Sequence, residues 1–220
     1  LVTINLNGIN SQWVVDAYSC FYYSQESYGD IRINGYKIGC SENVVIPSVL
    51  FGGNVTQIHY DAFRNSPITS ISISEGIQYI WDDAFRGSQL TSVSLPSTLI
   101  GIWDRAFQDA QLTSVNIPYG ITRIRWDSFR GNNLTSVTIP DSVTIIETSA
   151  FQNNQLTSVT IPDSVDTIGW YSFYDNNLTS ITIPNSVSLI GYSAFTSQIN
   201  ALWNGTVYGP SSGYVKDTYI

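Results

Sequence analysis

The chain has 220 residues, of which 43% are hydrophobic and 12% are charged, and its formal net charge is −8. This hydrophobic content is enough for a sizeable core, so we expect a globular protein. The acidic excess disfavours nucleic acid and anionic lipid as partners, because both are bound by basic side chains that neutralise phosphates. No stretch approaches the roughly 20 consecutive apolar residues of a membrane-spanning helix. We therefore expect no nucleic-acid partner and no membrane span.

Two cysteines, Cys20 and Cys40, precede the regular part of the chain. A disulfide between them would close a loop of about 20 residues and stabilise the fold by roughly 3 kcal/mol. Two buried thiols in a small cap are the alternative. A metal site is disfavoured, because the spacing is wrong for a zinc knuckle and the single histidine, His59, lies outside this segment.

An internal repeat governs most of the chain. Phenylalanines recur at a constant step of 22 residues, at Phe63, Phe85, Phe107, Phe129, Phe151, Phe173 and Phe195. A tripeptide ending in Thr-Ser keeps the same step from Ile68 onwards, and prolines keep it from Pro96 onwards. The chain therefore contains seven copies of one structural unit.

Each copy carries three groups of apolar residues. In one copy the first group alternates with Thr and Ser over residues 134–140, which is the pattern of a short strand with one buried face. The second and third groups follow and include Val143 and Phe151. One such coil cannot close a core by itself. We expect the copies to stack, with parallel strands about 4.8 Å apart and the phenylalanines in one buried column.

Asparagines precede the strand in three copies, at Asn132, Asn154 and Asn176. Side-chain amides commonly hydrogen-bond to the backbone of turns. We therefore interpret these residues as structural.

The consensus Leu-Thr-Ser-Val-Thr-Ile-Pro-x-Ser-Val-x-x-Ile-x-x-x-Ala-Phe resembles the BspA-like, or Treponema-type, class of bacterial leucine-rich repeats. The resemblance covers residues 68–199, and a divergent first copy extends it back to Val45, Ile46 and Pro47, with an insertion around residues 51–54. It implies a mainly β, right-handed leucine-rich-repeat solenoid with a parallel sheet on the concave face and short turns or 3-10 segments elsewhere. It also implies a secreted or cell-surface protein used in adhesion or partner contact.

The chain departs from that class in two ways. The common form has 23 residues and a Cys in the turn after Phe, whereas this chain steps by 22 and has Asn, Ser or Ala there. The Gly that usually follows the last Ile is present only at Gly169 and Gly191. The shorter repeat without Cys leaves the fold intact. The positions where Gly is missing are where we look for function.

The repeats divide the chain into three expected parts: an N-terminal β cap over residues 1–45, seven leucine-rich repeats over 46–199 and a C-terminal cap over 200–220. Caps are expected because a solenoid must cover its open ends. An alternative is that residues 1–45 belong to another domain.

The copies differ most at three positions that precede the Ala-Phe pair. Residues 134–143 and 156–165 are identical, but the stretches that follow them are not, and four of the six tryptophans fall at the variable positions. Large aromatics beside Asp and Arg are typical of protein-recognition surfaces. We predict that a partner binds along this flank, through Tyr60, Trp81, Asp82, Trp103, Asp104, Arg105, Arg125, Trp126, Trp170, Tyr171 and Tyr192.

Three other interpretations of these patterns remain open. The rings can serve only as packing, which would make the chain a structural spacer or display stalk. Aromatics beside carboxylates would also suit a glycan. The outward face of the strands, a nearly invariant ladder of Ser and Thr, is the third candidate, but its uniformity fits a solvated surface better than a discriminating site.

The sequence offers no set of residues for catalysis. It has no Gly-x-Ser-x-Gly, no pair of histidines and no phosphate-binding glycine loop. Carboxylates stack in adjacent copies, Asp82 over Asp104 and Asp61 over Asp83, and a bound calcium ion would relieve their repulsion. Calcium is nevertheless disfavoured, because Arg105, in column between Asp83 and Asp127, offers a simpler source of positive charge. We expect no enzyme activity and no cofactor, and we expect a cell-surface or matrix protein as the partner.

Overall fold

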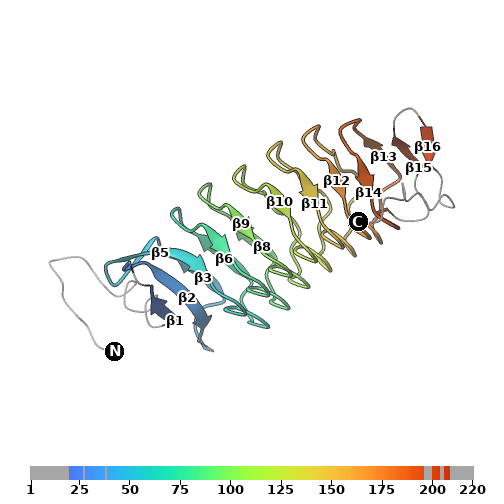
Figure 1. Ribbon diagram of the computed structural model, residues 1–220. Helices are drawn as coiled ribbons and strands as arrows, with labels where there is room; N and C mark the ends of the chain where they lie inside the picture. The colour runs from blue at the N-terminus through green and yellow to red at the C-terminus, as the bar shows by residue number, and fades with distance from the viewer. Residues whose placement is uncertain (1–19, 27, 38, 196–199, 204–205, 209–220) are drawn as a thin grey trace.

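The computed structural model describes residues 20–26, 28–37, 39–195, 200–203 and 206–208. Within these ranges the chain contains strands and turns but no helix. Successive coils stack side by side into an elongated solenoid (Figure 1). Residues 1–19 and 209–220 of the two expected caps lie outside the described residues.

The first apolar group forms the expected parallel pairing between some of the coils. The strands on this side are β3 (Asn43–Ile46), β6 (Ser70–Ile73), β8 (Ser92–Ser94), β13 (Ser180–Ile183), β15 (Asn200–Trp203) and β16 (Thr206–Tyr208). β3, β6 and β8 form one parallel sheet, and β13 pairs in parallel with β15, which pairs antiparallel with β16. Between the two sheets a single parallel bridge joins Asn116 to Thr138. The strands on this side therefore make an interrupted ladder.

The second apolar group also forms short strands, which is more regular than the turns or 3-10 segments expected there. These strands are β5 (Gly53–Ile58), β7 (Tyr79–Ile80), β9 (Gly101–Ile102), β10 (Arg123–Ile124), β11 (Ile145–Ile146), β12 (Thr167–Ile168) and β14 (Leu189–Ile190). They form two parallel sheets, one with β5, β7 and β9 and one with β10, β11, β12 and β14. Each of these strands ends on an isoleucine that packs in or against the core. Because every copy presents the same backbone groups at the same places, each coil can pair with the next one in the same way.

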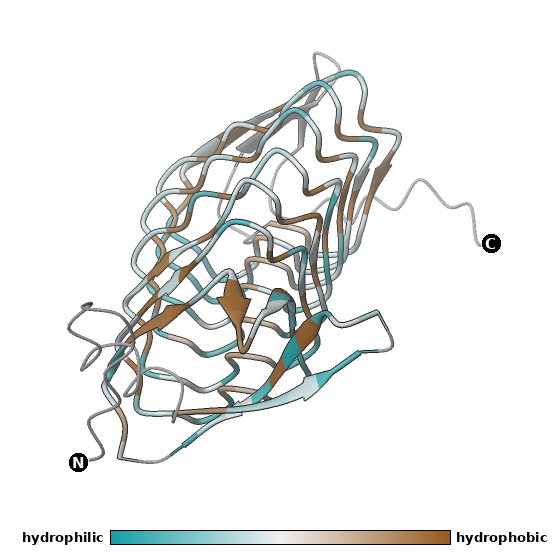
Figure 2. Cartoon of the chain, turned by 90° about the vertical axis from the view of Figure 1, so that its left-hand side faces the viewer, coloured by the Kyte–Doolittle hydropathy of each residue, from teal (hydrophilic) through white to brown (hydrophobic). Residues whose placement is uncertain are grey.

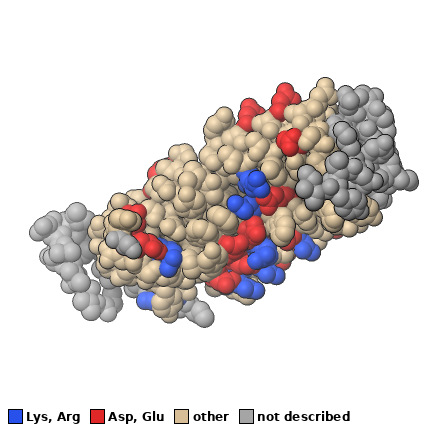
Figure 3. All heavy atoms as spheres, in the orientation of Figure 1, with Lys and Arg blue, Asp and Glu red and all other residues tan. Residues whose placement is uncertain are grey.

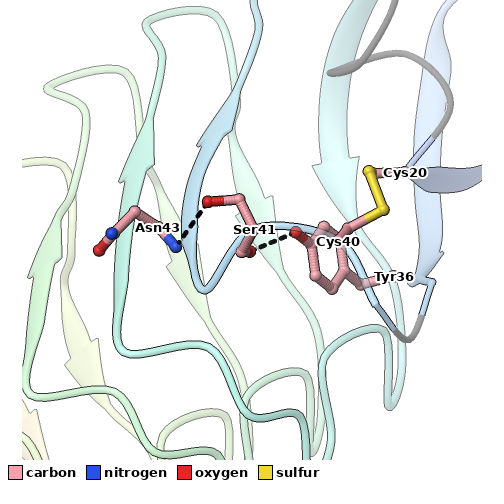
Figure 4. The surroundings of a disulfide bond; sticks show 5 residues. All are labelled: Cys20, Tyr36, Cys40, Ser41 and Asn43. Carbon is pink, nitrogen blue, oxygen red and sulfur yellow. Dashed lines mark hydrogen bonds between the residues drawn. A yellow bond between two sulfur atoms is a disulfide. The ribbon is translucent and has the colours of Figure 1, made fainter. Parts of the chain in front are cut away.

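At the N-terminal end, a β-hairpin extends the second ladder. β1 (Phe21–Gln25) pairs antiparallel with β2 (Ile31–Tyr36), and β2 pairs in parallel with β5. A disulfide joins Cys20 to Cys40 with their Cα atoms 5.9 Å apart, and links the start of this hairpin to the segment before β3 (Figure 4).

The insertion in the first repeat is a second hairpin. β4 (Val49–Leu50) pairs antiparallel with the start of β5. The turn residues Phe51 and Gly52 both have positive φ, 51° and 84°, as a two-residue turn between twisted strands requires.

The phenylalanine column predicted from the repeat lies in the core. The ring centroids of successive coils are 4.9–5.7 Å apart from Phe63 to Phe195, and the stacked rings are tilted by 17° or less. Hydrophobic residues recur at the same places in each coil (Figure 2). The core is therefore one continuous column that every coil extends.

The asparagines that precede the strands link neighbouring coils, which confirms their structural interpretation. The Oδ1 atom of Asn154 accepts a hydrogen bond from the backbone N–H of Leu134 (3.1 Å). Its Nδ2 atom donates to the carbonyl oxygens of Phe129 (2.9 Å) and Phe151 (3.1 Å). Asn132 and Asn176 make the equivalent bonds.

Two copies place a serine where the others have the alanine before Phe. Ser128 and Ser172 are fully buried, and their hydroxyls have no hydrogen-bond partner among the described residues. Replacing either serine by alanine is expected to raise the free energy of unfolding by about 1 kcal/mol, because a buried unpaired hydroxyl is removed. Urea unfolding followed by circular dichroism would measure the change.

The matched control for these variants is Ser88→Ala. The Ser88 side chain is also fully buried, but its hydroxyl donates to the carbonyl of Phe85 at 2.8 Å. This substitution should lower the free energy of unfolding. A loss of stability in Ser128→Ala and Ser172→Ala would show that their hydroxyls are satisfied by water.

Candidate functional site

The N-terminal part of the predicted flank is a ladder of rings. The ring centroids of Tyr60 and Trp81 are 5.5 Å apart. Trp81 stacks on Trp103 with a centroid distance of 4.7 Å and an interplanar angle of 21°. The guanidinium of Arg125 lies over the Trp103 ring, 3.9 Å from its centroid. Trp81 also donates from Nε1 to Oε1 of Gln57 at 2.9 Å. These contacts hold the two tryptophans partly buried.

The sequence reasoning missed Tyr79 and Gly101, two residues that position this ladder. The Tyr79 ring lies 5.8 Å from that of Trp81. A Cβ atom added at Gly101 would lie 3.0 Å from both Nε1 of Trp103 and Cδ1 of Tyr79, so glycine leaves the space that these rings occupy. The signal was available, because residues two apart in a strand point to the same side and Tyr79 and Trp81 are so spaced.

A row of ion pairs runs beside the ladder. Arg105 binds both carboxylate oxygens of Asp83, with Nε 3.1 Å from Oδ1 and Nη2 3.0 Å from Oδ2, and Arg86 binds the same carboxylate. Burial opposes the ionisation of Asp83, but the hydrogen bonds from Arg105 and Arg86 outweigh it and lower the pKa of this carboxyl. Asp127 pairs with Arg130 rather than with Arg105.

The backbone explains which residues occur in this row. The position directly before each Ala-Phe or Ser-Phe pair has positive φ, between 49° and 58°, in all seven copies. Branching at Cβ is disfavoured in this left-handed conformation, and Asp and Asn tolerate it best. The row therefore contains only unbranched residues, namely Asp61, Asp83, Arg105, Asp127, Ser149, Tyr171 and Ser193.

Asp104 and its neighbour in the same column, Asp82, differ from the other carboxylates of the flank, because neither forms an ion pair among the described residues. Asp61, Asp83, Asp127 and Glu147 each bind an arginine of the chain. Asp104 has no such hydrogen bond, and its Oδ1 atom is buried without a partner among the described residues. Burial, followed by the charges of Asp82 and Glu147, raises the pKa of the Asp104 carboxyl.

A shallow hollow of about 400 Å³ lies beside Asp104. It is lined by Asp104, Arg123, Arg125, Trp126 and Glu147. Arg123 and Glu147 form one wall as an ion pair at 3.0 Å, and the Trp126 side chain is 55% exposed. Acidic and basic side chains gather in the middle of the face shown in Figure 3. The sequence reasoning did not include Arg123 or Glu147 among the site residues.

The remaining aromatics form a second cluster. The Tyr171 ring lies 5.6 Å from that of Tyr174 and 5.8 Å from that of Tyr192. Trp170 is 59% exposed and lies against Gly191, where an added Cβ would clash with the indole. Gly191 thus gives room to the aromatic of the preceding coil.

The structure therefore divides the predicted flank into two parts. Six of the predicted residues lie in the ladder or line the hollow: Tyr60, Trp81, Trp103, Asp104, Arg125 and Trp126. Arg105 lies in the row of ion pairs, and Asp82 precedes Asp104 in the same column. Trp170, Tyr171 and Tyr192 lie in the second cluster. The intervening coil contributes Glu147, Thr148 and Ser149 at the variable positions and no aromatic side chain.

No metal site or membrane-spanning helix is found in the part of the chain that the structure describes. There, no three side chains of His, Cys, Asp or Glu are grouped so that they could hold a metal ion. The same residues form no helix of the length and hydrophobicity that a membrane crossing requires.

The stacked 22-residue coils, the phenylalanine column and the asparagine ladder define a leucine-rich-repeat solenoid. The model of the BspA type leucine rich repeat region matches residues 17–135 and 122–203 in six copies. The chain belongs to this family. No curated protein sequence matches it significantly.

Solved structures share the fold. A leucine-rich repeat protein of T. pallidum is 27% identical with a TM-score of 0.71, over 79% of this chain and 83% of that one. A leucine-rich cell surface protein of Faecalibacterium prausnitzii is 21% identical with a TM-score of 0.51, over 83% and 74% of the two chains. The pneumococcal vaccine antigen PcpA is 20% identical with a TM-score of 0.50, over 84% and 51% of the two chains. Repeat solenoids commonly serve as binding scaffolds.

Proposed function

We propose that the chain is a secreted or surface-displayed binding module that recognises a cell-surface or matrix protein through its aromatic and charged flank. The observation that carries this proposal is the half-exposed indole of Trp126 at the edge of the hollow lined by two arginines and two carboxylates. Tryptophan and arginine are the residues most enriched among those that dominate protein interfaces. No catalytic role is proposed.

The geometry favours some of the predicted residues over others. Trp126 and Trp170 are more than half exposed, so a partner would bury a large apolar area on them. Trp81 and Trp103 are already stacked on each other and partly buried. We assign the binding energy to the exposed rings and a supporting role to the stacked pair.

The second candidate function is that of a spacer or display stalk. It is favoured by the Trp81–Trp103 stack, because rings that pack on each other between coils stabilise the solenoid without any partner. Under this alternative the exposed rings contribute nothing to recognition.

Two features support an extracellular location. The Cys20–Cys40 disulfide is of a kind that persists in oxidising compartments. Among the proteins that share the fold, one is described as a cell surface protein and another as a vaccine antigen.

A binding comparison on a panel of cell-surface proteins, matrix proteins and glycans tests the proposal. The double variant Trp126→Ser/Trp170→Ser should lose at least about 2 kcal/mol of binding free energy to a protein of the panel, as expected for two central aromatic residues. Because both side chains are exposed, its thermal unfolding should change little.

The matched control is Tyr119→Ser, which removes an aromatic that is 73% exposed but lies outside the flank. It should leave binding unchanged. Equal binding by the double variant and the parent chain would refute the proposed flank and favour the spacer. Binding only to glycans of the panel would show that the ligand is a carbohydrate and not a protein.

A further inference from the structure

The hollow beside Asp104 carries a more specific inference about the partner. Within the flank, four carboxylates are each bound by an arginine of the chain, whereas Asp82 and Asp104 have no hydrogen-bonding cation among the described residues, and of these two only Asp104 lines the hollow. Its Oδ1 atom is already removed from water. Part of the cost of desolvating this carboxylate has therefore been met in the unbound chain.

The neighbouring cations do not fill the site. Arg123 binds Glu147 at 3.0 Å. The guanidinium of Arg125 lies over Trp103 instead of binding Asp104. The hollow thus joins an unpaired carboxylate to an exposed indole, because Asp104 and Trp126 occupy the same column in successive coils and line the same space.

We propose that this hollow receives an arginine side chain of the protein partner, with its guanidinium bound to the Asp104 carboxylate and placed against the Trp126 ring. A planar guanidinium can hydrogen-bond to the carboxylate oxygen that is not buried and at the same time stack on an aromatic face, which a lysine ammonium does less well. The chain itself shows both contacts separately, in Arg105 bound to Asp83 and in Arg125 over Trp103. The net charge of −8 also favours the approach of a basic partner.

This inference rests on the proposed binding function, but it can be tested without the partner. The probe is N-acetyl-arginine N-methylamide, titrated into ¹⁵N-labelled chain and followed by the indole Nε1–H resonance of Trp126 and the backbone amide of Asp104. The neutral citrulline analogue has nearly the same shape and serves as the ligand control. We expect a saturable shift with the arginine compound and none with citrulline.

The variants isolate the carboxylate. Asp104→Asn keeps the shape of the side chain and should weaken arginine binding by roughly tenfold or more, as loss of a charged hydrogen-bonding partner does. Asp141→Asn removes an exposed carboxylate outside the flank and should leave the affinity unchanged. Trp126→Ser, read at the Asp104 amide, should also weaken binding, which covers the case that Asp104→Asn does not fold.

Three results would overturn the inference: an equal response to citrulline, unchanged affinity in Asp104→Asn, or the same loss in Asp141→Asn as in Asp104→Asn. If a partner bound in a Trp126-dependent way but the arginine probe gave no response, the arginine site would be refuted and the proposed binding flank would be supported. A saturable arginine response with no partner in the panel would support the arginine site and count against the broader function.

Discussion

Replacing Phe129 by alanine is expected to lower the free energy of unfolding by about 3–5 kcal/mol, as is usual when a buried phenylalanine is truncated. The Phe129 ring is fully buried and stacks on Phe107 at 5.6 Å and on Phe151 at 5.5 Å. Alanine would remove both contacts and leave a cavity that rigid neighbouring coils cannot close. Urea unfolding of the parent and the variant, followed by circular dichroism, would measure the loss.

The position of Phe129 in the middle of the column makes this loss large. Each coil of a solenoid is stabilised by its two neighbours, so a defect in a central coil weakens two interfaces at once. The control is Phe195→Ala, because the Phe195 ring is partly exposed and stacks on one described ring, that of Phe173. Its loss should be clearly smaller. Equal losses at the two positions would mean that the column does not contribute through stacking between coils.

The sequence was sufficient to predict the column and the coil, because the same side chain recurs at a fixed step. When every copy carries Phe at one position, stacking of the copies must bring the rings together. The buried asparagines followed from the same reasoning, since an amide in a turn between stacked coils lies within reach of two backbones. These features depend on one coil and its neighbour only.

Other features depend on contacts that a periodic pattern does not specify. The hairpin at residues 49–54 interrupts the repeat, and its register comes from the turn formed by Phe51 and Gly52 rather than from the coil. Apart from β5, the strands of the second ladder have only two residues each, too few for an alternation to be recognised.

The candidate site was predicted as one strip, whereas the structure divides it. The variable positions lie in neighbouring columns of the stack, but how far each ring projects depends on the side chains that it packs against. Gly101 leaves space for the Trp103 ring, which stacks on Trp81 and is covered by Arg125, whereas the Trp126 ring is exposed to solvent. These differences in exposure depend on contacts between side chains of different columns and different coils, so the sequence of a single repeat does not specify them.

Replacing Asn154 by alanine is expected to lower the free energy of unfolding by about 3 kcal/mol, because it leaves several buried backbone groups without partners. The amide side chain is buried and bonds to the N–H of Leu134 and to the carbonyls of Phe129 and Phe151. These groups belong to successive coils, so the substitution removes links between coils as well as bonds within one. Urea unfolding would measure the change.

Two controls separate the links between coils from the loss of a polar side chain. Asn154→Ser should give an intermediate loss, since Ser88 at the equivalent position bonds only to the carbonyl of Phe85 in its own coil. Asn133→Ala changes an exposed neighbour and should alter stability by no more than about 0.5 kcal/mol. If Asn154→Ala were as mild as Asn133→Ala, water would be replacing the amide, and the backbone ladders and the phenylalanine column alone would hold the coils together.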